Sequence, residues 1–211
     1  YFLKELSGRF LFKNNDIKVD SLRFRVNESD LYTKGYFKNI ISYMLLENQT
    51  IEVIGEINSN KLNVEDIMPV AASTETNEEE SQIILPEDIT FNINMKVEEF
   101  NFGKFSADHM KGKIKYANKK IQARSLSFNT LNGNLRSNIT IIQNPENNFV
   151  VQTESKLSNI NITQLFYAFD NFGQDFLIDK NLKGTVNSHM KLSGTWRNDF
   201  TVMEDRIIAE G

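Results

Sequence analysis

Hydrophobic and polar residues alternate along much of the chain. The clearest alternation covers residues 89–97, where every second residue is apolar: Ile89, Phe91, Ile93, Met95 and Val97. Because successive side chains of a β-strand point to opposite faces of a sheet, this pattern predicts strands with one apolar and one polar face. Similar runs, separated by turn residues, occur at 10–12, 17–26, 114–116, 126–128, 135–141 and 149–157. A change of phase at Asp20 and Ser21 predicts a β-bulge.

Two segments follow a helical period instead. Residues 163–172 place large apolar side chains three or four positions apart, after a candidate N-cap at Asn161 or Thr163 and before Gly173 as a C-terminal stop. Residues 37–46 form the second candidate. Both segments are predicted to be short helices that lie across a sheet or plug its open end.

The strand pattern occurs twice. A shift of 104 residues places the apolar and glycine positions of residues 6–12 (LSGRFLF) on those of residues 110–116 (MKGKIKY). Further along, residues 60–67 match residues 158–165, and the pattern Leu-x-Gly-x-apolar starts a third time at Leu182. Agreement in glycines, turns and apolar phase over this length indicates a duplicated supersecondary unit.

The repeat and the local composition divide the chain into three predicted parts. Residues 1–69 form a first β-meander with the short helix near 37–46, and residues 84–211 form a second one with the helix near 163–172 and the start of a third unit. Residues 70–83 are small, polar and acidic, which favours a flexible linker. A cation site is the alternative, but consecutive Glu residues without a turn glycine fit no Ca²⁺ loop. Because the chain starts without Met and enters a strand pattern at once, we expect it to be part of a longer protein.

Composition and charge exclude several classes of protein. The hydrophobic fraction of 40% and the charged fraction of 25% are typical of a globular chain rather than a disordered one. The absence of cysteine excludes disulfides and thiolate zinc sites. No apolar stretch reaches the roughly 18–20 residues that a membrane helix needs. The formal net charge of −4 gives no electrostatic footprint for nucleic acid, which would need a clustered basic face.

The sequence contains no recognisable catalytic or metal-binding pattern. The two histidines, His109 and His189, have no partner at metal-ligand spacing, and the neighbours Glu98 and Glu99 would point to opposite faces of a strand. Phosphate-binding and nucleophile-elbow motifs are absent from the sequence. We therefore expect no enzyme, no cofactor and no metal. An enzyme would require a pocket that joins His109 or His189 to an acidic residue.

The apolar face of the predicted sheet is the feature with the most functional potential. We expect it to be lined by nine residues: Phe10, Phe12, Phe24, Phe91, Ile93, Met95, Ile114, Tyr116 and Phe128. In one interpretation these residues are the core of a sandwich or of a helix-covered sheet. In the other, the sheet curls into an open trough that accepts acyl chains, because an exposed apolar surface of that size needs a ligand, a partner or a lid.

Five segments follow one another in a characteristic order and spacing: residues 84–97 (ILPEDITFNINMKV), 110–114 (MKGKI), 131–135 (LNGNL), 160–169 (INITQLFYAF) and 192–195 (LSGT). In this order they resemble the C-terminal region of AsmA-like proteins of the Bacteroidetes type, over about residues 6–195. The resemblance implies a long periplasmic β-rich body, an inner-membrane anchor outside this chain, and no catalytic residues. It also implies a role in outer-membrane biogenesis, in which repeated β units form an apolar groove that carries phospholipid.

Residues and resemblance together predict a mainly β fold, a curved antiparallel meander built from duplicated β units with one or two short helices. The expected function is a non-catalytic periplasmic module that binds phospholipid or another acyl lipid along an apolar groove, with other envelope proteins as partners. The alternative is a structural scaffold or adaptor with a sealed β core, which acts through protein contacts at its open sheet edges.

Overall fold

The computed structural model of the chain describes residues 3–67, 84–173, 175–198 and 201–211. Residues 1–2, 68–83, 174 and 199–200 lie outside the described part, and with them the predicted linker at 70–83.

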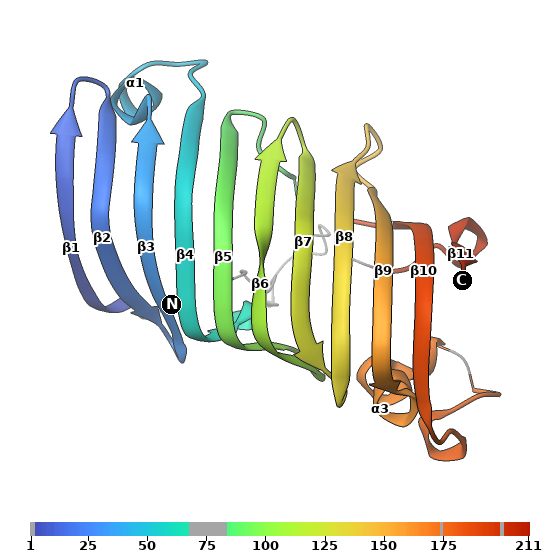
Figure 1. Cartoon of the computed structure of the whole chain (residues 1–211). Helices are drawn as coiled ribbons and strands as arrows, with labels where there is room; N and C mark the ends of the chain where they lie inside the picture. The colour runs from blue at the N-terminus through green and yellow to red at the C-terminus, as the bar shows by residue number, and fades with distance from the viewer. Residues whose placement is uncertain (1–2, 68–83, 174, 199–200) are drawn as a thin grey trace, which may run out of the picture.

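Within the described residues, eleven strands form one open sheet in which the strand order follows the chain order (Figure 1). The strands are β1 (Leu3–Lys13), β2 (Asp16–Val26), β3 (Ser29–Lys38), β4 (Ile51–Asn63), β5 (Ile89–Phe102), β6 (Phe105–Ala117), β7 (Lys120–Thr130), β8 (Gly133–Gln143), β9 (Phe149–Asn161), β10 (Thr185–Trp196) and β11 (Ile208–Glu210). Three short α-helices and three 3-10 turns complete the chain: α1 (Ile40–Leu45), α2 (Val64–Ile67), α3 (Ile162–Ala168), η1 (Asp170–Gly173), η2 (Asp179–Asn181) and η3 (Glu204–Arg206). The predicted curved, mainly β meander is confirmed.

One pair of neighbouring strands departs from the antiparallel pattern. Strands β4 and β5 are parallel, with Ile51 opposite Ile89 and Asn63 opposite Asn101, whereas the other neighbours are antiparallel. Parallel neighbours require a crossover connection rather than a tight hairpin turn. Because β4 and β5 pair along their whole length, both halves of the chain share one sheet. The division into separate parts stays a prediction.

The duplicated unit is visible in the order of the elements. Strands β1 to β4 are followed by the short helix α2, and strands β6 to β9 are followed by α3. The two copies differ in what comes next. After α2 the chain enters a parallel strand, whereas after α3 it enters the antiparallel strand β10, in which Thr185 lies opposite Asn161.

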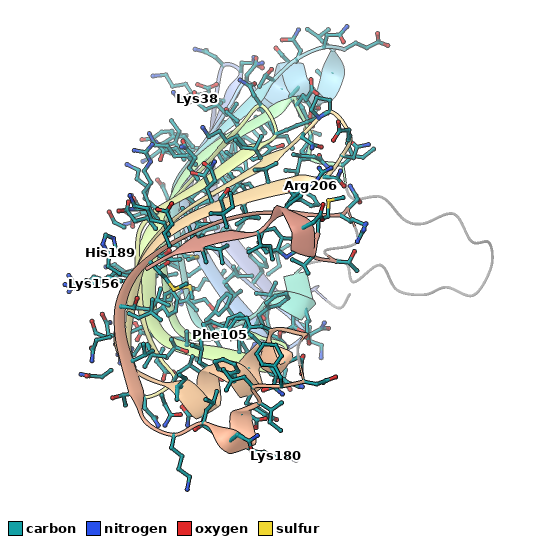
Figure 2. The ribbon with its side chains drawn as sticks, turned by 90° about the vertical axis from the view of Figure 1, so that its right-hand side faces the viewer. Lys38, Phe105, Lys156, Lys180, His189 and Arg206 are labelled. Atoms are coloured by element: carbon teal, nitrogen blue, oxygen red, sulfur yellow. The ribbon has the colours of Figure 1, made fainter. Side chains whose placement is uncertain are left out.

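Bulges bend the strands. The predicted bulge at Asp20 and Ser21 is confirmed, since the register of β2 shifts there against both of its neighbours. Further register shifts coincide with left-handed residues, at His109 in β6, Ser125 in β7 and Asn159 in β9. A bulge increases the local bend of its strand. Figure 2 shows the result, a sheet whose strands curve around one concave side.

The two predicted helices lie close to their expected positions, at opposite ends of the strands (Figure 1). Helix α1 is held against the β1–β2 turn by Asn15, whose Oδ1 accepts from the backbone N–H of Ser42 at 2.7 Å. Helix α3 begins at the predicted cap Asn161, whose side chain accepts from the N–H of Gln164 at 2.9 Å. This helix ends at Ala168, before the predicted stop at Gly173, because left-handed residues from Asp170 onwards break it.

Candidate functional site

The concave side of the sheet carries two rows of mostly apolar residues. Residues paired directly across neighbouring strands point to the same face of a sheet. Following these pairs from β1 to β10 gives a first row: Phe12, Ile17, Phe37, Val53, Phe91, Tyr116, Ile121, Ile141, Val151 and Gly194. A second row runs beside it: Phe10, Val19, Gly35, Gly55, Ile93, Ile114, Ala123, Ile139, Thr153 and Leu192. We call the surface that contains both rows the apolar face.

All nine residues predicted to line an apolar surface lie on the apolar face. Six of them belong to the two rows: Phe10, Phe12, Phe91, Ile93, Ile114 and Tyr116. The other three extend the face toward the α3 end of the strands, where Phe24 pairs with Leu31, Met95 with Ile57, and Phe128 with Leu135. The alternation of apolar and polar residues therefore identifies which side of each strand lies on the apolar face, whereas lipid binding by these nine residues stays a prediction.

The nine residues differ widely in burial. Phe10 and Phe12 on the outer strand β1 are 47% and 66% exposed, whereas Tyr116 and Phe128 are almost completely buried. The remaining five are half-buried. The closed part of the face is a core cluster near the α2 and α3 end of the strands, made of Leu31, Leu62, Val97, Ala107, Met110, Leu126 and Phe128. The apolar face thus combines a packed core at one end with half-open rows beyond it.

Tyr116 anchors the segment before β5 onto the apolar face. Its ring stacks on Phe91 with 5.1 Å between the centroids, and its hydroxyl donates to the carbonyl of Pro86. Burial raises the pKa of the Tyr116 phenol, so the side chain stays a neutral donor. Near the same end, the backbone N–H of Leu85 donates to Gln143 Oε1 at 2.8 Å. These contacts place residues 85–86 over β6 and β8.

An aromatic cluster closes the other end of the apolar face. Phe105, which points to the concave side in Figure 2, contacts Phe128 at 6.0 Å and Phe169 at 5.9 Å between ring centroids. Phe172 continues the cluster by stacking on Phe169 at 5.6 Å. An ion pair between Lys104 and Asp170 fixes this segment to the β5–β6 turn. Sequence reasoning assigned the aromatic residues after Asn161 to a helix but missed Phe105 as their partner, because the contact joins residues distant in sequence.

The polar side of the sheet contains an open depression of about 850 Å³ that is lined by both histidines and by Glu154. His189 Nε2 lies 3.2 Å from Glu154 Oε1, and His109 Nδ1 lies 2.8 Å from Glu98 Oε2. The pocket that an enzyme would require is therefore present. However, these four side chains are at least half exposed. Electrostatic catalysis depends on sites that exclude water, and this depression is open to it.

Two further findings, on metal ions and on membrane-spanning helices, concern the described residues only. No three His, Asp or Glu side chains there come close enough together to hold a metal ion. Among the described helices, none is long and apolar enough to cross a membrane.

Comparisons of the chain with models of known protein families, with curated proteins and with solved structures gave no match. The resemblance to AsmA-like proteins therefore stays a prediction from the residues that carry it.

Proposed function

We propose that the chain is a non-catalytic lipid-handling module that binds acyl chains along its apolar face. The proposal extends to the setting that the AsmA-like resemblance implies, namely the periplasmic body of a protein anchored in the inner membrane and engaged in outer-membrane biogenesis. Phospholipid or another acyl lipid is the proposed ligand, and other envelope proteins are the proposed partners.

The length of the two apolar rows is the observation that carries this proposal, although the second row has no side chain at Gly35 and Gly55 and a polar one at Thr153. Each row crosses ten strands, which at the usual strand spacing of about 4.8 Å corresponds to roughly 43 Å. The rows run across the strands and therefore along the axis of the curved sheet (Figure 2). An extended acyl chain laid along this axis would contact one strand after another, with its burial worth about 0.8 kcal/mol per CH₂.

The partial exposure of the rows supports the same proposal. Phe91, Ile93 and Ile114 lie at the centre of the sheet yet are only half-buried. Side chains of this kind in the middle of an ordinary core would be fully buried. Their remaining apolar surface is available to a ligand, whose polar headgroup would stay in water at the open edge.

The second candidate, a scaffold with a sealed core, is favoured by the packed α3 end. There Val97 and Ile160 have no exposed surface, and the aromatic cluster around Phe105 fills the space between α3 and the sheet. If the whole apolar face were closed in this way, the chain would act through its sheet edges instead.

Replacing both Phe91 and Ile93 with Gln is expected to lower the affinity for a fluorescent phospholipid about tenfold or more, because polar groups would interrupt both rows at β5. The matched control replaces Thr90 and Asn94 with Gln, on the same strand but in positions that alternate with the apolar ones. The control is expected to bind like the unmodified chain. Fluorescence titration measures binding, and circular dichroism verifies that both variants are folded.

Two results would count against the proposal. One is an unmodified chain that binds no phospholipid and carries none in native mass spectrometry. The other is an equal loss of binding in both double variants, which would separate lipid binding from the apolar face and move the scaffold candidate ahead.

A further inference from the structure

The polar face of the sheet carries a row of four Lys and Arg residues that continues to a histidine. Following the strand pairs from β5 to β10, Lys96 lies opposite Lys111, and Arg136 lies opposite Lys156. Ser127 joins these two pairs across β7, and His189 continues the row on β10. We call the row formed by Lys96, Lys111, Arg136, Lys156 and His189 the cation crest. At the usual strand spacing it is about 24 Å long.

The cation crest lies where the sheet bulges outward most. Figure 2 places Lys156 and His189 at the outermost part of the convex side, opposite the side that holds Phe105. All five side chains are exposed. Because the crest runs across the strands, it follows the axis of the curved sheet. A flat surface laid against the convex side would therefore touch the protein along the crest.

The lysines and the arginine of the crest lack ion-pair partners among the described residues, unlike three lysines on β2 and β3. Lys34 pairs with Glu56 at 3.0 Å and Lys38 with Glu52 at 3.0 Å, and Lys18 pairs with Asp20 at 2.7 Å. Within the crest, like charges face each other directly across neighbouring strands, an arrangement that destabilises a sheet. Glu154 pairs with His189 at 3.2 Å, but the lysines and the arginine of the crest carry no ion pair among the described residues, so an anionic surface can supply their counter-charge.

Basic residues are enriched in the strands, and acidic residues are enriched in the rest of the chain. Strands β1 to β10 carry 18 Lys and Arg residues against 10 Asp and Glu residues, although the chain as a whole has a net charge of −4. The acidic excess lies in the turns, helices and connecting segments. The net charge of the chain therefore conceals an excess of basic residues in the strands.

We propose that the cation crest docks the convex side onto the surface of an anionic phospholipid bilayer. Lys111, Arg136 and Lys156 line the depression of about 850 Å³, together with serine and asparagine side chains that can donate hydrogen bonds to a phosphate. The crest matches a plane rather than a single strand of nucleic acid, because its positions include no Phe, Tyr or Trp on which successive bases could stack. This inference is independent of acyl-chain binding, which uses the opposite face.

The test compares two triple variants that remove the same amount of charge from the same face. Replacing Lys111, Arg136 and Lys156 with Gln neutralises the crest, and replacing Lys18, Lys34 and Lys38 with Gln neutralises paired lysines. Binding is measured by flotation with phosphatidylglycerol-containing vesicles and with pure phosphatidylcholine vesicles. The crest variant is expected to lose about 100-fold in affinity for the anionic vesicles, since three cations leave the contact. The control variant is expected to change by less than about threefold, because remote charges are screened.

Three outcomes would overturn the proposal: an unmodified chain that does not float with anionic vesicles, an equal loss in both variants, or displacement from vesicles by a 20-nucleotide single-stranded DNA that binds more tightly through the crest. The last outcome would assign the crest to nucleic acid. Binding of fluorescent phospholipid by the crest variant is measured in parallel. If it is retained while flotation is lost, the two faces act separately.

Discussion

Replacing Gly55 with valine is expected to lower the free energy of unfolding by about 3 kcal/mol or more. A Cβ at Gly55 would lie 2.5 Å from the carbonyl oxygen of Lys34 and 3.3 Å from the Cα of Gly35. Both contacts are with backbone atoms of β3, so no side-chain rotation relieves them. The β3–β4 pair would have to separate at the point where Gly35 and Gly55 face each other in the second apolar row. Urea unfolding followed by circular dichroism measures the change.

Gly103 offers the control for this experiment. It lies in the β5–β6 turn with a φ of +56° and has no atom within 4 Å of a built Cβ. Asn tolerates this left-handed conformation, so replacing Gly103 with Asn is expected to cost less than about 1 kcal/mol. A Gly55→Val variant that unfolds at the same urea concentration as the Gly103→Asn variant would contradict the close approach of β3 and β4.

Replacing Asp66 with Asn is expected to destabilise the fold by about 3 kcal/mol. The carboxylate of Asp66 accepts hydrogen bonds from the backbone N–H and the hydroxyl of Ser29, at 3.0 and 2.7 Å, and from the N–H of Glu28 at 3.2 Å. Ser29 is completely buried, so its N–H has no access to water once the carboxylate is gone. The substitution also turns an amide N–H₂ group toward a donor in either orientation, because one carboxylate oxygen accepts from Ser29 and Glu28 and the other accepts from the Asn27 side chain at 3.3 Å.

The same site makes stability depend on pH. Burial acts to raise the pKa of the Asp66 carboxyl, but hydrogen bonds from Ser29, Asn27 and Glu28 outweigh it and hold the pKa below its ordinary value of 3.8. Because the folded pKa is below the unfolded one, the stabilisation is complete above the unfolded pKa and is lost as the pH falls through the folded pKa. The hydrogen bonds of Asp30 lower its pKa and add to the effect.

Urea unfolding between about pH 5 and pH 2 tests this dependence, and the Asp66→Asn variant should lose stability less steeply than the unmodified chain as the pH falls. The control is Asp88→Asn, since Asp88 is exposed and accepts from Tyr43 Oη at 3.0 Å. This variant removes one exposed carboxylate and leaves the contacts of Ser29 intact, so its stability should fall more steeply with pH than that of the Asp66→Asn variant. Identical profiles for the Asp66 and Asp88 variants would show that the contacts of Ser29 do not hold a charged carboxylate.

The strands and their apolar face were predictable because alternation with a period of two is a local property. Residues 89–97 reveal both the strand and its apolar side without knowledge of any neighbour. The repeat was predictable for a similar reason, since glycine and apolar positions recur at a shift of 104 residues, which becomes 98 further along the chain. The helices followed from spacing and from the cap at Asn161, although the left-handed turn that ends α3 has no comparable signal.

The direction of β5 was not predictable from the residues. The connections after β4 and after β9 begin with matching sequences and short helices, yet one leads to a parallel strand and the other to an antiparallel one. Alternation is the same for both directions, and the length of the connection permits either.

The cation crest can be recognised only when the register of six strands is known. Lys96, Lys111, Arg136 and Lys156 are spread over 61 positions of sequence, and only the pairing of their strands brings them into one row. A net charge of −4 pointed away from any basic surface. The row of cations on one face and the rows of apolar residues on the other therefore arise from the same in-register pairing.

The orientation of these rows determines how such a protein grows. The apolar rows run in the direction in which strands are added, so another copy of the unit would lengthen them while leaving the cross-section unchanged. The step from β1 to its counterpart β6 is five strand spacings, a rise of about 24 Å per duplication. In a quasi-one-dimensional array each unit contacts only its neighbours, so span is proportional to copy number. The length of such a protein would then depend on the number of units and would not require a change within any one unit.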